Sequence, residues 1–174
     1  AVGLAVDSGI LVVAQEHAVT ALLREQIHRM TRPTPKDFLP TIGVCTPSND
    51  FHEMGILVAA ALADLFAFKT VYMGANLPVD ALAYMIKAMP MDVVLIGAAP
   101  TKSNFESFRD YVAGVRRMVE SKGSPRSCRI AIGGPLAVSF SKDVVTFPSM
   151  ADFYRFLKEE RSIALTAKRR RQKK

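Results

Sequence analysis

The sequence predicts an α/β protein in which a doubly wound, five-stranded parallel sheet is preceded by one or two helices. Three observations predict this fold class. Strand-like and helix-like segments alternate over most of the chain, the strand-like segments are nearly continuous apolar runs, and prolines separate this alternation from an amphipathic helix. Strands of a parallel sheet are apolar throughout because helices cover both of its faces.

The expected elements follow one another in regular βα order. We expect strands near residues 41–46, 68–73, 92–97, 128–133 and 143–147, and helices near residues 53–66, 78–89, 103–122 and 150–160. Five such strands with helices between them fit a flavodoxin-like sheet with strand order 2-1-3-4-5. In that topology a ligand binds beyond the carboxyl ends of the strands, where the first strand neighbours the third.

The chain divides into four parts: a helical cap segment (1–31), a linker (32–40), the α/β domain (41–162) and a basic tail (163–174). Apolar residues from Ile10 to Ile27 recur at three- and four-residue spacing, which predicts an amphipathic helix ending near Met30. Residues 1–8 would close a preceding helix. One or two helices make no core of their own, so we expect them to pack on the α/β domain or to belong to a truncated bundle.

Composition restricts the class of protein. With 174 residues, 49% hydrophobic and 22% charged, the chain can bury a sizeable core. No apolar run reaches the roughly 18 residues that span a bilayer, and the first residues do not resemble a signal peptide.

Cys45 and Cys128 lie in predicted strands without metal-ligand spacing. We therefore expect a cytoplasmic protein with buried, reduced cysteines. The first residue is Ala rather than Met, so a longer protein stays an alternative.

Three loops should meet at the predicted ligand crevice. They follow the first, third and fourth strands and comprise residues 48–55, 97–103 and 133–136. The first loop carries His52, with a carboxylate two residues earlier at Asp50 and a glycine three residues later at Gly55. Asp50 could accept a hydrogen bond from one ring nitrogen and leave the other free for a metal. A plain surface histidine and plain turn glycines are the alternatives.

The three loops together resemble the cobalamin-binding domain, whose members bind corrinoids base-off with a protein histidine on cobalt. The family pattern is Asp-x-His-x-x-Gly, then Ser-x-Leu, then Gly-Gly. Asp50, His52 and Gly55 match the first element, and Gly133-Gly134 matches the last. The resemblance implies that His52 is the lower axial ligand of cobalt and Asp50 its hydrogen-bond partner. It also implies that Gly55, Gly133 and Gly134 give room for the nucleotide tail.

The middle element departs from the family pattern. Ala98-Ala99-Pro100 stands where Ser-x-Leu is expected, and in the family that serine lines the channel for the displaced benzimidazole tail. The departure implies a different anchoring of the tail, for which Thr101 or Ser103 could supply a hydroxyl group. Ser48, at the start of the His52 loop, is a further candidate cofactor-binding residue.

The pair Glu16-His17 in the upstream helix resembles a motif of one particular group within this family. The pair is similar to the Glu-His of the helical bundle that caps cobalamin in photoreceptor-type transcriptional regulators, which typically have Trp-x9-Glu-His. Val6 stands at the tryptophan position and the chain has no Trp. Since that tryptophan shields an adenosyl group, the resemblance implies a hydroxo or aquo cobalamin, or His17 as upper ligand. An ordinary Glu-His on a helix is the alternative. Antirepressor relatives that use cobalamin without adenosyl are similar in this respect.

The favoured function is a cobalamin-binding sensory module, light- or redox-responsive, that controls transcription through a partner protein such as a transcription factor or through an attached DNA-binding region. The alternatives are a corrinoid methyl carrier or mutase subunit, a haem-binding variant of the same domain, and a domain without cofactor. No catalytic dyad and no phosphate-binding loop follow from the sequence. We therefore expect no enzymatic activity of the chain alone.

The basic tail dominates the charge of the chain. Six Lys and Arg residues occupy the last seven positions, and removing them from the net charge of +7 leaves +1. We expect a solvated, disordered end, with a nucleic-acid or acidic-partner contact as the alternative. No aromatic residues are interleaved with these charges, so sequence-specific DNA reading is not expected.

Overall fold

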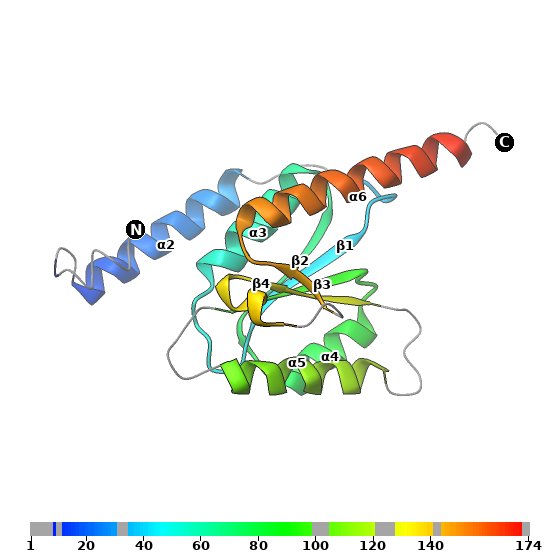
Figure 1. Cartoon of the computed structure of the whole chain (residues 1–174). Helices are drawn as coiled ribbons and strands as arrows, with labels where there is room; N and C mark the ends of the chain where they lie inside the picture. Colours follow the sequence, from blue (N-terminus) through cyan, green and yellow to red (C-terminus); the bar gives the residue numbers. More distant parts are fainter. Residues whose placement is uncertain are drawn as a thin grey trace.

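The computed structural model describes residue 9 and residues 12–30, 35–98, 105–120, 128–140 and 144–171. Its elements in chain order are α2 (Val13–Met30), β1 (Thr41–Pro47), α3 (Met54–Leu65), β2 (Lys69–Leu77), α4 (Val79–Ala88), β3 (Val93–Gly97), α5 (Phe105–Glu120), β4 (Arg129–Gly133), the 3-10 helix η1 (Pro135–Ser139), β5 (Val145–Phe147) and α6 (Met150–Arg171). All strand pairs are parallel, and the sheet order is β2-β1-β3-β4-β5 (Figure 1). The predicted flavodoxin-like sheet is confirmed.

Helices cover both faces of the sheet, with α3 and α6 on one face and α4 and α5 on the other (Figure 1). Consecutive residues of a strand point to opposite faces. In β3, Val93 and Leu95 join the core cluster under α3 and α6, whereas Val94 and Ile96 join the cluster under α4 and α5. These four side chains are at most 3% exposed. Burial on both faces explains why the strands are apolar at every position.

The helical cap segment packs on the α/β domain, as one of the two expected alternatives requires. Helix α2 lies against α3 (Figure 1), and the Arg24 guanidinium forms an ion pair with the Glu53 carboxylate just before α3. Residues 1–8, predicted to close a preceding helix, lie outside the described residues, as do linker residues 31–34.

Helix α6 is longer than predicted. The expected helix near 150–160 continues to Arg171, so the predicted disordered tail is helical as far as the structure describes it. Ala164 packs against the core cluster under α3 and α6, and the Lys168 ammonium lies 4.4 Å from the centroid of the Phe38 ring. These contacts stabilise the helix beyond residue 160, and basic residues are favourable at a helix C-terminus.

Two further observations concern the class of protein. Within the described ranges, no helix combines the length and the apolar character needed to cross a bilayer. Cys45 is buried, Cys128 is half-buried, and both are free thiols. Burial raises the pKa of the Cys45 thiol to about 12 and that of the Cys128 thiol to about 11.

We expect both cysteines to resist alkylation in the native protein. Because the thiolate is the nucleophile, a pKa of about 12 for Cys45 leaves about one thiolate in ten thousand at pH 8. Iodoacetamide labelling followed by mass spectrometry should show slow modification in buffer and complete modification in denaturant. Rapid labelling of Cys45 in the native protein would contradict its burial in β1.

Candidate functional site

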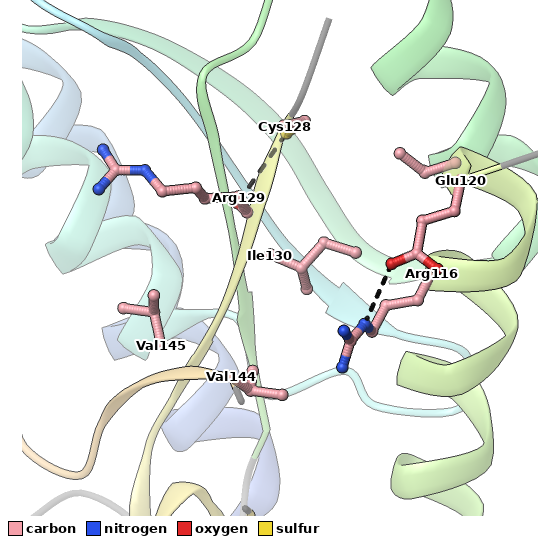
Figure 2. Close-up of a pocket in the computed structure, with 8 residues that line it drawn as sticks. Arg116, Glu120, Cys128, Arg129, Ile130, Val144 and Val145 are labelled. Atoms are coloured by element: carbon pink, nitrogen blue, oxygen red, sulfur yellow. Dashed lines mark hydrogen bonds and ion pairs between the residues drawn. The ribbon is translucent and has the colours of Figure 1, made fainter. Parts of the chain in front are cut away.

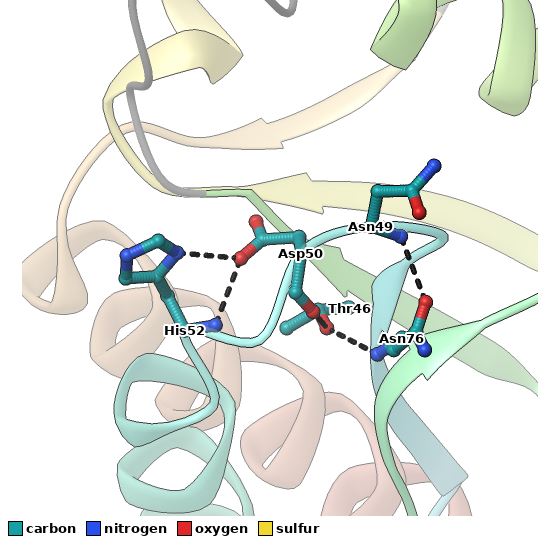
Figure 3. A network of polar contacts seen from close by, with 5 residues as sticks. All are labelled: Thr46, Asn49, Asp50, His52 and Asn76. Carbon is teal, nitrogen blue, oxygen red and sulfur yellow. Dashed lines mark hydrogen bonds and ion pairs between the residues drawn. The ribbon is translucent and has the colours of Figure 1, made fainter.

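The loop after β1 is held by a buried hydroxyl group. Thr46, 1% exposed, donates a hydrogen bond from its Oγ1 to the backbone oxygen of Asp50. The same Oγ1 accepts a hydrogen bond from the backbone N–H of Asn76 at 2.9 Å (Figure 3). That N–H also lies 3.0 Å from the Asp50 oxygen. The end of β2 therefore fixes the backbone of the loop that carries His52.

Two asparagines complete this backbone arrangement. Asn49 has φ 65° and Asn76 has φ 56°, a left-handed conformation that asparagine tolerates better than most residues. The backbone N–H of Asn49 donates to Oδ1 of Asn76 at 2.8 Å (Figure 3). The register between β1 and β2 shifts between Cys45 and Pro47. Where the regular ladder is interrupted, side-chain hydrogen bonds thus supply the missing pairing.

The predicted contact between Asp50 and His52 is present. One carboxylate oxygen of Asp50, Oδ1, accepts the backbone N–H of His52 at 2.9 Å and lies 2.9 Å from the ring nitrogen Nδ1. The Asp50 side chain is 11% exposed, whereas the His52 side chain is 65% exposed. A carboxylate at Nδ1 favours the tautomer with the proton on Nδ1. The other nitrogen, Nε2, then carries no proton, and its electron pair can bind a metal. It lies on the side of the ring away from Asp50 (Figure 3).

Gly55 differs from the paired glycines in its surroundings. A Cβ atom at Gly55, the second residue of α3, would meet nothing within 4 Å. At Gly134, with φ 102°, a Cβ atom would lie 2.6 Å from the backbone oxygen of Ala98, and at Gly133 it would lie 3.0 Å from Cδ1 of Leu95. The fold itself therefore favours glycine at 134, where the backbone is in the way and φ is positive, whereas a side chain at 133 would press on Leu95. Their role in giving room to a ligand stays a prediction, whereas Gly55 faces open space.

The carboxyl ends of β3 and β4 lie side by side. The backbone N–H of Ala98 donates to the oxygen of Gly133 at 3.1 Å, and Ala98 is 8% exposed. The Phe140 ring packs edge-on against Phe105 and Phe108 of α5, which anchors the segment after Gly134. Three of the expected loops therefore start from one edge of the sheet.

Of the other predicted cofactor-binding residues, Ser48 is described with its side chain. Ser48 is exposed, and its Oγ donates to the backbone oxygen of Leu77 at 3.4 Å. Thr101 and Ser103 lie outside the described residues. Glu16 and His17 belong to α2, but the structure does not describe their side chains.

Sequence reasoning missed Glu53. Its carboxylate accepts a hydrogen bond from the Tyr72 hydroxyl at 2.6 Å and pairs with Arg24 of α2. Burial raises the pKa of the Tyr72 hydroxyl, and Arg24 partly opposes that rise. The signal for this contact was weak, because nothing in the sequence relates a helix residue before the linker to the residue after His52. Glu53 thus joins the helical cap segment to the His52 loop.

Metal-binding side chains are sparse. In the part of the chain that the structure describes, no three His, Cys, Asp or Glu side chains gather as a metal-binding group.

A cavity of about 210 Å³ lies at the opposite edge of the sheet, between α5 and the starts of β4 and β5 (Figure 2). Its two charged groups on α5, Arg116 and Glu120, pair with each other at 3.5 Å. Cys128, Ile130 and Val144 complete part of its wall. This cavity is separate from the His52 loop because the amino and carboxyl ends of parallel strands lie at opposite edges.

The fold and the site together define a flavodoxin-like domain with a carboxylate-held histidine at the carboxyl edge of its sheet. Over 134 residues the chain is 28% identical to the HTH-type transcriptional repressor CarH of Myxococcus xanthus, an alignment covering 76% of this chain and 42% of the repressor. The chain thus spans less than half the length of this curated relative. No protein-family model matches the chain.

Solved structures share the fold. A cobalamin-binding protein from Desulfitobacterium hafniense DCB-2 superimposes with a TM-score of 0.54 at 17% identity, covering 91% of this chain and 76% of that one. The methanol:cobalamin methyltransferase complex MtaBC of Methanosarcina barkeri gives 0.57 at 17% identity, with 91% and 61% covered. The monomethylamine corrinoid protein of Methanosarcina barkeri gives 0.59 at 12% identity, with 90% and 76% covered.

These comparisons confirm the predicted resemblance. At 12% to 17% identity the solved structures show a common fold, and the curated relative carries the likeness in sequence. The fold of this chain is that of cobalamin-binding proteins.

The Thr46 hydroxyl should contribute measurably to stability. We expect Thr46→Val to lower the free energy of unfolding by about 1–3 kcal/mol, because it leaves a buried backbone carbonyl without its hydroxyl partner. Urea unfolding followed by circular dichroism measures the change. Thr166→Val, which removes an exposed hydroxyl group on α6, is the control and should change stability by less than about 0.5 kcal/mol. Equal losses in both variants would contradict a special role for Thr46.

Proposed function

We propose that this chain is a cobalamin-binding sensory module in which His52 is the lower ligand of cobalt. The observation that carries the proposal is the Asp50–His52 contact at the carboxyl edge of the sheet, where doubly wound domains bind ligands. The imidazole ring is 65% exposed, so Nε2 is accessible to a metal that arrives with a cofactor. The similarity to CarH and the fold shared with corrinoid proteins support the same cofactor.

The residues fit such a cofactor. A carboxylate that accepts a hydrogen bond from Nδ1–H orients the ring and fixes the tautomer, which leaves Nε2 for a metal. Gly55 keeps the surface beside the loop open, since a Cβ atom there would meet nothing within 4 Å. When bound, cobalamin would supply exchange of the upper ligand on cobalt. The protein would supply the lower ligand and its orientation.

Helix α2 would transmit the ligand state. Arg24 joins α2 to Glu53, the residue next to His52. Position 17 precedes Arg24 by two helical turns, which is about 10 Å along the helix axis. We assign to Glu16 and His17 the upper side of the cofactor, with hydroxo- or aquocobalamin favoured over adenosylcobalamin because the chain has no Trp. A ligand change that favours one position of α2 would then alter binding of a transcriptional partner.

A corrinoid methyl carrier is the second candidate function. Two of the structures that share the fold are a methanol:cobalamin methyltransferase complex and a monomethylamine corrinoid protein. A carrier would act only with a partner enzyme, so the chain alone would again have no activity. Ala98 at the family's serine position keeps a haem-binding variant as a third candidate.

Absorption spectra test the proposed ligand. We expect purified protein mixed with hydroxocobalamin to show the bands of a base-off, histidine-ligated corrinoid, and His52→Ala to lose them. His28→Ala, a histidine to which no role is assigned, should keep them. An unchanged spectrum for His52→Ala would contradict the proposal, and a Soret band after addition of haemin alone would favour haem. A light-dependent ligand change that alters partner binding favours the sensor, whereas methyl transfer with a partner enzyme favours the carrier.

A substitution at Gly55 tests cofactor binding without disturbing the folding of the chain. We expect Gly55→Leu to weaken cobalamin binding at least about tenfold, because the side chain would occupy the open space beside His52. It should not destabilise the apoprotein, since the position is exposed in α3 and Leu favours helices. Val58→Leu, one turn further along the same exposed side of α3, is the matched control and should bind normally. Titrations followed by absorbance measure both affinities, and equal affinities would contradict the proposed position of the cofactor.

A further inference from the structure

The C-terminal half of α6 concentrates positive charge. From Arg161 to Lys174 the sequence has seven Lys and Arg residues and no Asp or Glu. The helix reaches Arg171, and residues 168–170 are all exposed. Successive helical residues are about 100° apart around the axis, so these three cations point to different sides of the helix rather than forming one face. Like charges this close repel each other, and a polyanion would relieve that repulsion.

The structure adds a groove that the sequence did not reveal. Residues 35–38, just before β1, face α6 across a solvent-open groove of about 610 Å³ that includes Lys36, Asp37, Phe38, Ala164 and Lys168. The backbone of this segment is held in place, because the N–H of Lys36 donates to the oxygen of Ala67 at 2.9 Å. The Phe38 ring positions the Lys168 ammonium at 4.4 Å. Lys36 and Lys168 thus line one groove, and the Phe38 ring contacts Lys168 beside the arginine-rich turn.

The basic end of α6 and the groove lie away from His52. Helix α6 starts after the carboxyl end of β5 and runs back across the sheet, so its C-terminal half lies toward the amino edge and extends past the sheet (Figure 1). Of the three acids of α6, all nearer its start, Asp152 pairs with Arg155 and Glu160 pairs with Arg129 at 2.7 Å. Asp37 is the acidic residue among the described residues that line the groove.

We infer that Lys168, Arg169 and Arg170 of α6, together with Lys36, bind the phosphate backbone of nucleic acid without reading its sequence. Arginine binds phosphate through two parallel hydrogen bonds. Charges on different sides of a helical turn suit a ligand with charge along its whole length, whereas an acidic helix of a partner protein would match a single basic face. This binding does not depend on a bound cofactor.

Fluorescence anisotropy of labelled oligonucleotides tests the inference with the full chain. We expect several unrelated sequences to bind with similar affinity and a steep salt dependence. The triple variant Lys168→Gln, Arg169→Gln, Arg170→Gln should bind at least about tenfold more weakly. Its slope of log affinity against log salt should fall by up to about 2.7, the value for three lost phosphate contacts. Glutamine favours helices, and circular dichroism checks that α6 is retained.

A charge-matched control distinguishes a local site from the net charge. Arg109→Gln, Arg116→Gln, Arg117→Gln removes the same three charges from α5 on the other face of the sheet, and should bind within about twofold of the unmodified chain. Equal losses in both triple variants would overturn the inference, as would absence of binding at low salt. Displacement of the oligonucleotide by polyglutamate at equal charge concentration would also overturn it and indicate an acidic protein partner.

Discussion

The candidate site depends on a single carboxylate that is nearly buried. Asp50 holds both the backbone N–H and the ring of His52 with one oxygen. Its own backbone oxygen is held by Thr46 and by the N–H of Asn76. A buried carboxylate is costly unless it is hydrogen-bonded, so the loop is stable in the arrangement that places His52 outward. The geometry of an exposed ring is thereby set by a nearly buried carboxylate and a buried hydroxyl group.

The parallel sheet separates the two functional edges that we propose. All strand ends that carry ligand-type residues lie at the carboxyl edge, together with the start of α3 and its contact to α2 through Glu53. The amino edge carries the basic end of α6 and the segment around Phe38. Because α6 runs antiparallel to the strands, one helix connects the carboxyl edge with the amino edge. A cofactor and a polyanion would therefore not compete for the same surface.

The sequence was sufficient for the fold class and the main loop because both depend on local patterns. Apolar strands such as Val93–Gly97 are a local signal, and so is the spacing of Asp50, His52 and Gly55. Contacts between distant residues left no such signal. Thr46 meets Asn76 across two strands, and Lys168 meets Phe38 from the other end of the domain. The paired glycines show a different limit, since packing against Ala98 and Leu95 explains them without a ligand.

The central claim is a bond between Nε2 of His52 and cobalt, and electron paramagnetic resonance of the cob(II)alamin form tests it most directly. The protein is prepared with ¹⁵N-labelled histidine, and the cofactor keeps natural nitrogen. Ligation by His52 predicts that the nitrogen splitting changes from triplets in unlabelled protein to doublets in labelled protein. Triplets in both samples would contradict the claim, because the benzimidazole of the cofactor would then still be the lower ligand.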